Sequence, residues 1–494
     1  MIYQDLETLI YSLSAAEKKK FQSYTNQLGG EKKYFRLYQI ILLNKNKPSD
    51  TWKSSFNSEF PNVALESLAN YLYKVLTDVL INTRIDQNSW YQQFHGLMKA
   101  QLCFERSIPE RGLKEINAIY KKASLSENYL GIYMAQRMEL NALQAQSFVG
   151  LKEQDLIDRQ MNAKLALQSI RDIQEHYSLY ELLVMRINNK LAFDKDANDL
   201  ILGELNLTFH NYNTRFETKK VHLLFQSHFF IHKSDYQSAL QIFQELAVLF
   251  ESNTQIWNFP PYDYLSTLDG ILNSLRSTSQ FEEMQTYIDK VKQLQTDRYP
   301  DHFRKLAVGT GAIYSLNRAV CQDRLDNALE LINDESVNQV ILYGLGDLEK
   351  KIEWYFFRAA CYYIRKDFQR GKALLNEMFF NCSTGSNYPA FRAGRLLYIV
   401  IIYELDDAEY ISSEIRAYKR LFQKKGKLHG VERLIFKLIG YDPKRRGNEW
   451  KRKTQDKVNK QIETLLANKR EITLYKYIGH LGWFNQLICS SPRG

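Results

Sequence analysis

Three histidines in one stretch of the chain are the residues best placed to bind a metal ion. His222, His228 and His232 fall within a single helical pattern, and the last two lie four residues apart, on one face of a helix. Imidazole nitrogens at that spacing can hold a transition metal. No Cys, Asp or Glu accompanies them at a ligand spacing, and the HExxH motif is absent. We therefore favour partner contact for His228 and His232, with packing or metal ligation as the alternatives, and we expect no metal and no cofactor.

Two glycines in the run Val308–Ala312, which reads VGTGA, are the nearest approach to a phosphate-binding loop. No strand pattern precedes them, and no Gly-Lys-Ser/Thr follows them, so close packing of helices explains the glycines better. The sequence also contains no GxSxG, no Cys–His pair in a familiar context and no paired-carboxylate motif. We expect a protein that is not an enzyme.

Positive charge is concentrated near the end of the chain. Residues 415–476 hold 19 Lys or Arg against 6 Asp or Glu, whereas the whole chain has a net charge of only +10. This stretch could contact nucleic acid or an acidic protein, or it could be the solvated face that closes a helical stack. No zinc finger, RNA-recognition sheet or basic zipper accompanies it. The candidate contact residues are Lys444, Arg445, Arg446, Lys451, Arg452 and Lys453.

The elements that would position these groups are helices, and they recur. In the stretch Val221–Phe250, two apolar helical patterns flank a polar turn at 233–235, and Tyr236 and the small Ala239 follow the turn. A small residue there allows two helices to approach closely. Equivalent positions recur at intervals of 45, 44, 43 and 42 residues, at Ala239, Met284, Ala328, Gly371 and Ser413.

This pattern resembles the tetratricopeptide repeat (TPR), in a form longer than the standard unit of about 34 residues. The resemblance implies an all-α fold, namely a right-handed α-solenoid of antiparallel helix pairs, because one such unit cannot bury its apolar face alone. An irregular helical protein without true repeats is the alternative. We expect an N-terminal helical module at 1–88, irregular helical repeats at 89–220, TPR-like repeats at 221–425 and a basic helical cap at 426–494.

The N-terminal module shows clear helix signals. Ser14 and Glu17 match a capping box, in which each side chain bonds the backbone N–H of the other residue. The segment from Leu13 to Tyr24, with Lys33-Tyr34, Leu72-Tyr73 and Arg84, resembles the start of a bacterial helical-repeat family. That resemblance covers only the first part of the chain and implies no activity.

Composition agrees with long helices in a reducing compartment. The 494 residues include only 22 Gly and 9 Pro but 32 Tyr and 27 Phe, rings that can fill the space between helix layers. The five cysteines are dispersed and form no CxxC pair. The longest apolar run, 396–403, has eight residues, where a membrane span needs about 20. We expect a cytoplasmic protein that does not enter membranes.

These observations favour a scaffold that binds a protein or peptide along the concave face of the repeats. A transcriptional or signalling regulator, with a ligand-sensing repeat domain and a nucleic-acid-binding basic surface, is the alternative. We expect the groove residues to be partly exposed and not paired with one another. They are Leu224, His228, Ile231, His232, Asp269, Asn273, Arg276, Ile313, Asn317, Phe356, Ala360 and Tyr363.

Overall fold

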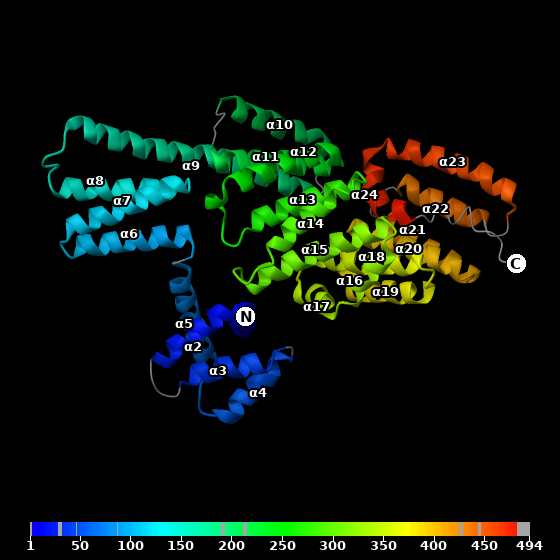
Figure 1. Cartoon of the computed structure of the whole chain (residues 1–494), viewed down its shortest axis with the longest axis horizontal. Coiled ribbons are helices and arrows are strands. Elements are labelled where there is room, and N and C mark those ends of the chain that lie inside the picture. The colour runs from blue at the N-terminus through cyan, green and yellow to red at the C-terminus, as the bar shows by residue number, and fades with distance from the viewer. Residues whose placement is uncertain are drawn as a thin grey trace. The chain divides into compact units, whose positions relative to one another are not determined.

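The structure is a computed structural model that describes residues 2–27, 32–45, 47–85, 87–188, 193–210, 215–423, 428–442 and 446–481. Every regular element in these ranges is a helix, and many consecutive helices pack on one another (Figure 1). The all-α prediction is therefore confirmed. None of the described helices is long and apolar enough to cross a membrane.

The chain forms two compact units that interleave along the sequence. Unit 1 contains residues 1–222, 249–261 and 297–301, and unit 2 contains residues 223–248, 262–296 and 302–494. The first helices of unit 1 enclose their own core around Trp52, Phe56 and Leu72. They are α1 (Ile2–Ser12), α2 (Ala15–Gln27), α3 (Lys33–Leu43), α4 (Ser49–Glu59) and α5 (Leu65–Ile85).

The predicted capping box begins α2. The backbone N–H of Ser14 donates to Glu17 Oε2 at 2.8 Å, and the N–H of Glu17 donates to Ser14 Oγ at 3.2 Å. Glu17 also pairs with Arg84 of α5 at 3.0 Å, which ties the start of α2 to the last turn of that helix. The remaining unit 1 helices are α6 (Ser89–Glu105), α7 (Pro109–Leu125), α8 (Tyr129–Ala145), α9 (Glu153–Asn188), α10 (Phe193–His210) and the start of α11 (Phe216–His232).

Unit 2 is built from helix pairs that follow the predicted repeats. The pairs are α11 with α12 (Tyr236–Ser252), α13 (Tyr262–Ser277) with α14 (Met284–Gln293), α15 (Asp301–Cys321) with α16 (Leu325–Asn333), α18 (Leu348–Ile364) with α19 (Phe368–Asn381), and α20 (Pro389–Glu404) with α21 (Ala408–Gln423). A short α17 (Glu335–Gln339) precedes α18, and α22 (Gly430–Tyr441), α23 (Asn448–Leu466) and α24 (Lys469–Ile478) follow the pairs.

One turn geometry repeats between the two helices of each pair. The second residue after the first helix has a positive φ, and the next backbone N–H bonds a carbonyl five residues earlier, as Asp235 N does to Phe230 O at 2.8 Å. This is the Schellman ending of a helix, here made without glycine. The positive-φ residues are Ser234, Ser279, Asp323, Lys366 and Asp406.

The predicted close-approach positions hold for four units and miss in the fifth. Ala239, Met284, Ala328 and Gly371 are buried near the start of the second helix, whereas Ser413 is exposed. Counted from the positive-φ residue, the equivalent of Gly371 in the fifth unit is Ile411, which is buried. The prediction of Ser413 was wrong because α21 begins at Ala408, so the buried position near the start of this helix comes two residues earlier than predicted.

Candidate binding groove beneath the C-terminal helix

The last described helix, α24, lies across the repeats of unit 2. It packs against α13 and α20, which are first helices of their pairs, and against α22 and α23 (Figure 1). The Asn468 side chain caps the helix by accepting from Arg470 N at 3.1 Å. We call the surface that α24 covers, formed by α13, α15, α18 and α20 with the α11–α12 turn, the inner groove.

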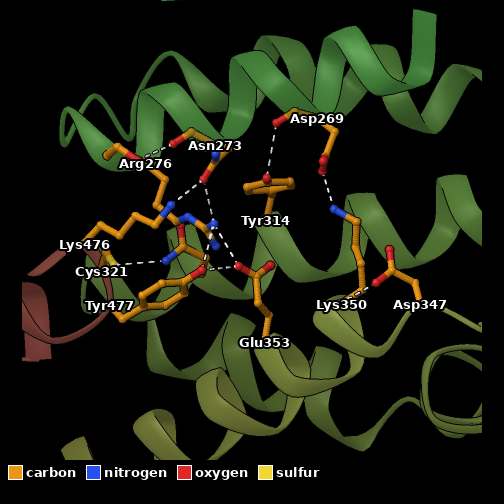
Figure 2. Close-up of polar contacts among 12 residues, drawn as sticks. Asp269, Asn273, Arg276, Tyr314, Cys321, Asp347, Lys350, Glu353, Lys476 and Tyr477 are labelled. Carbon is orange, nitrogen blue, oxygen red and sulfur yellow. Dashed lines mark hydrogen bonds and ion pairs between the residues drawn. The ribbon is translucent and has the colours of Figure 1, made fainter. Parts of the chain in front are cut away.

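Arg276 of α13 is the centre of the inner groove. Its side chain is 2% exposed, and its Nη2 donates to Glu353 Oε1 of α18 at 2.8 Å and to Asn273 Oδ1 at 2.9 Å. The guanidinium carbon lies 5.2 Å from the ring centre of Tyr314 and 4.9 Å from that of Tyr477, within cation–π range. Figure 2 shows these groups converging from α13, α15, α18 and α24.

Two adjacent residues of α24 enter this cluster. Tyr477 Oη donates to Glu353 Oε1 at 2.5 Å, and its ring lies edge-on to Phe356 at 5.5 Å between centres. Lys476 Nζ donates to Asn273 Oδ1 at 2.8 Å (Figure 2). The same nitrogen lies 5.0 Å from the ring centre of Tyr236. Both side chains are buried, so α24 inserts a tyrosine and a lysine between the repeats and does not merely cover them.

Polar contacts from the first half of α24 fix its position. Near its start, Lys469 pairs with Asp235 in the α11–α12 turn, and Thr473 Oγ1 lies 3.2 Å from Ser234 Oγ. On another side of the helix, Glu471 accepts the N–H of Gly430 at 2.8 Å and of Val431 at 3.1 Å, which caps the start of α22. These contacts set which side chains of α24 face the repeats.

The charges in the groove are balanced across helices. Burial alone would raise the pKa of the Glu353 carboxyl, but the positive charges of Arg276 and Lys350 and the hydrogen bonds from Tyr477 and Arg276 lower that pKa to about 2. Burial lowers the pKa of the Lys476 ammonium below its usual value. At neutral pH Glu353 and Arg276 are both ionised and form a hydrogen-bonded ion pair, so they are suited to recognition and not to proton transfer.

Some of the predicted groove residues do lie together in the inner groove, but most of these are buried. Asn273, Arg276 and Phe356 all contact α24, but Arg276 and Phe356 are almost fully buried, and Asn273 bonds Arg276. For these residues our expectation of exposed, unpaired side chains was wrong, because α24 and neighbouring first helices fill the space. Ile313, Asn317, Ala360 and Tyr363 are buried too. The others keep some exposure: Leu224, His228, Ile231 and Asp269 are half-buried, and His232 is exposed.

Only some of the candidate cations of the basic cap are exposed. Arg446, Arg452 and Lys453 are exposed, whereas Lys451 is buried and so does not lie on the surface that a candidate contact residue requires. The helical period explains the difference, since Lys451 lies on the same side of α23 as the buried Val458. Lys444 and Arg445 lie outside the described residues.

Sequence reasoning missed the residues that complete the groove. Glu353 stands among aromatic and apolar residues in Ile352–Phe357, and a lone carboxylate in such a run indicates a buried partner of opposite charge. Lys476 and Tyr477 carried no local signal, because Lys476 was one cation among many in the basic stretch. Their partners lie more than 100 residues away along the chain.

Unit 1 has an open cleft of about 1100 Å³. Aromatic side chains form much of its lining, namely Trp90, Tyr91, Tyr129, Tyr177, Phe216, Trp257, Phe259 and Tyr299. Such a lining suits peptide contact. The inner groove is the stronger candidate because a chain segment of defined chemistry is seated in it.

No protein-family model and no curated protein matches the chain. The functional argument therefore depends on the contacts of α24 with the repeats.

Proposed function

We propose that the chain is a non-enzymatic scaffold that binds a helical segment of a partner protein in the inner groove. The carrying observation is that a helix of the chain itself, α24, already binds there through Lys476 and Tyr477. Recognition of a helix by a groove depends on a few anchor side chains at helical spacing. Here we infer that the groove is the concave face of a right-handed TPR-like solenoid.

The groove defines what its partner should offer. Glu353 accepts a phenolic hydroxyl, Asn273 accepts an ammonium group, and Phe356 takes the edge of an aromatic ring. A partner helix with an adjacent Lys-Tyr pair and apolar neighbours would reproduce these contacts. Such a helix must displace α24, so α24 acts as a competing ligand that sets the threshold for binding.

The test supplies the helix in trans. A labelled peptide of residues 466–481 is titrated into the full-length chain and into a full-length variant with Lys476→Ala and Tyr477→Ala. We expect fluorescence anisotropy to report binding to the variant at least 10-fold tighter than to the unchanged chain, because the variant's own helix no longer competes well. A peptide carrying the same two alanines is the control and should bind neither protein.

If the variant remains folded by circular dichroism and still does not bind the peptide, the groove is a closed core and the proposal fails.

If the variant does bind the peptide, a library of helical peptides screened against the same variant identifies the partner motif. Enrichment of Lys-Tyr pairs is the expected outcome, and unselective recovery would contradict the motif that we derive from α24.

A second candidate function is supported by the exposed cations of α23. Arg452, Lys453, Lys457 and Lys460 are all exposed on this helix. If they contact nucleic acid, a gel shift with random duplex DNA should weaken steeply as salt rises, because bound phosphates release counterions. Charge reversal at Arg452 and Lys453 should abolish the shift. If the unchanged chain gives no shift in low salt, these cations form a solvated surface and do not bind nucleic acid.

A further inference from the structure

Two histidines and a glutamate from three successive helices meet inside unit 1. His176 Nδ1 lies 2.9 Å from Glu204 Oε1, and His222 Nδ1 lies 2.7 Å from the same oxygen. The three candidate ligand atoms all lie within 4.8 Å of one another. Among the described residues, this is the one group of three side chains with that geometry. Helices α9, α10 and α11 supply one residue each.

The site is enclosed. The side chains of His176 and Glu204 are each 3% exposed, and that of His222 is 20% exposed, which leaves one side open. A buried carboxylate is costly unless charge or hydrogen bonds compensate it. On α11, Lys220 is paired with Glu217 at 2.7 Å, and that carboxylate offsets much of its positive charge.

The donor set selects a class of ion. Two imidazole nitrogens and one carboxylate oxygen suit Zn²⁺ and its transition-metal neighbours, whereas Ca²⁺ and Mg²⁺ prefer all-oxygen sites. In a tetrahedral zinc site with bonds of about 2.0–2.1 Å, neighbouring ligand atoms lie roughly 3.3 Å apart. The two observed separations are a few tenths of an ångström shorter, so small side-chain rotations would admit the ion.

Two states of this cluster exclude each other. Without an ion, each imidazole can donate its Nδ1–H to Glu204, which satisfies that carboxylate oxygen. With an ion, both Nδ1 atoms must offer lone pairs, so the ring protons move to Nε2. Direct measurement of metal binding therefore distinguishes a metal site from a hydrogen-bonded network.

We propose that His176, Glu204 and His222 bind one Zn²⁺-class ion, with water at the open fourth position. The ion ties α9, α10 and α11 together in unit 1. The site is independent of the inner groove, whose residues all belong to unit 2.

The experiment uses the full-length chain, stripped with a chelator and then titrated with ZnCl2 by calorimetry and with CoCl2 by visible absorption. We expect one ion per chain, the intense visible bands of tetrahedral Co²⁺, and a higher Tm with zinc than without it. The variants His222→Asn and Glu204→Gln should each weaken binding at least 10-fold.

A matched control comes from α11 itself, since His232→Gln removes an exposed histidine from the helix that carries His222. This variant should bind zinc as the unchanged chain does. Because Glu204 is buried, circular dichroism checks that its variant folds, and the more accessible His222 provides a second, milder test. Absence of binding to the unchanged chain, or equal binding by all variants, would identify the cluster as a hydrogen-bonded network and overturn the proposal.

Discussion

Arg276 and Glu353 form a buried ion pair whose two residues are 77 positions apart in the sequence. Such a pair gives little net stability, because taking both charges out of water costs about as much as their attraction returns. Removing one partner is different, since the other charge then stays buried and uncompensated. The pair therefore determines which helices pack together, and it adds little to the free energy of that packing.

The first prediction follows from that asymmetry. Arg276→Met should lower the free energy of unfolding by about 3–5 kcal/mol, because Glu353 is left without its main counter-charge. The double variant Arg276→Met with Glu353→Met should recover much of the loss. Urea unfolding of the two singles and the double measures the coupling, and additive losses would show that the two side chains act independently.

The second prediction concerns acid. The pKa of Glu353 is lowered to about 2, so its stabilising contribution is complete above the usual carboxyl pKa near 4.5 and is lost as the pH falls through the folded value. Relative to a protonated Glu353, the ionised carboxylate stabilises the fold by about 3 kcal/mol, which is separate from the small net value of the ion pair. The stability gap between the unchanged chain and Glu353→Gln should therefore narrow from pH 5 towards pH 2. A constant gap in urea titrations would mean that Glu353 is not ionised in the fold.

At the level of single residues, the sequence predicts some of the residues of the inner groove and misses the others for a physical reason. Helical phase places Asn273, Arg276 and Phe356 on first helices, and they do reach the inner groove. Exposure depends on what covers a face, and no local pattern indicates that Lys476 and Tyr477 return to these residues. The same holds for His176 and Glu204, whose partner His222 was considered only beside its neighbours on α11.

At the level of helices, the close packing of α19 depends on Gly371. A side-chain carbon added at Gly371 would lie 3.2 Å from Ile401 Cδ1 and 3.4 Å from the carbonyl oxygen of Ala359, tighter than or close to the limit of ordinary contact. Gly371 therefore allows α19 to pack closely against both α18 and α20. The repeat pattern anticipated this position, because small residues at helix contacts leave a clear sequence signal.

The third prediction tests that contact. Gly371→Leu should lower the free energy of unfolding by about 1–3 kcal/mol through overpacking. Ala373→Leu, at an exposed position on the same helix, should change little. The neighbouring Lys372 is not a suitable control, because it is half-buried with its ammonium 5.6 Å from the Tyr410 ring centre. Equal Tm values for the two leucine variants would contradict the observed register.

Over the whole molecule, two interleaved units carry two separate candidate sites. Unit 1 includes residues 249–261 and 297–301 through contacts such as Phe216 with Phe250 and Phe259 with Tyr299, each at 5.5 Å between ring centres. Sequence patterns indicate helices and turns in order along the chain. They do not indicate that a segment returns to an earlier unit, because such contacts depend on tertiary packing.

The fourth prediction separates the units. Tyr477→Ala removes the hydrogen bond to Glu353 and the ring contact with Phe356, so α24 should open more often. Hydrogen exchange measured by mass spectrometry should rise at least 10-fold in 469–478 and stay unchanged in α1–α8. Faster exchange throughout unit 1 would mean that the inner groove and unit 1 unfold together.

The position of α24 in the chain also matters during synthesis on the ribosome. Every helix that lines the inner groove is translated before α24, so Arg276 and Glu353 can meet while Tyr477 has not yet been made. If the inner groove binds a partner helix as proposed, a partner present during that interval binds without displacing anything, whereas the same partner added to the finished chain must first compete with α24. On the proposed function, assembly during translation should therefore be faster than assembly from purified proteins, because the partner reaches the inner groove before α24 is made.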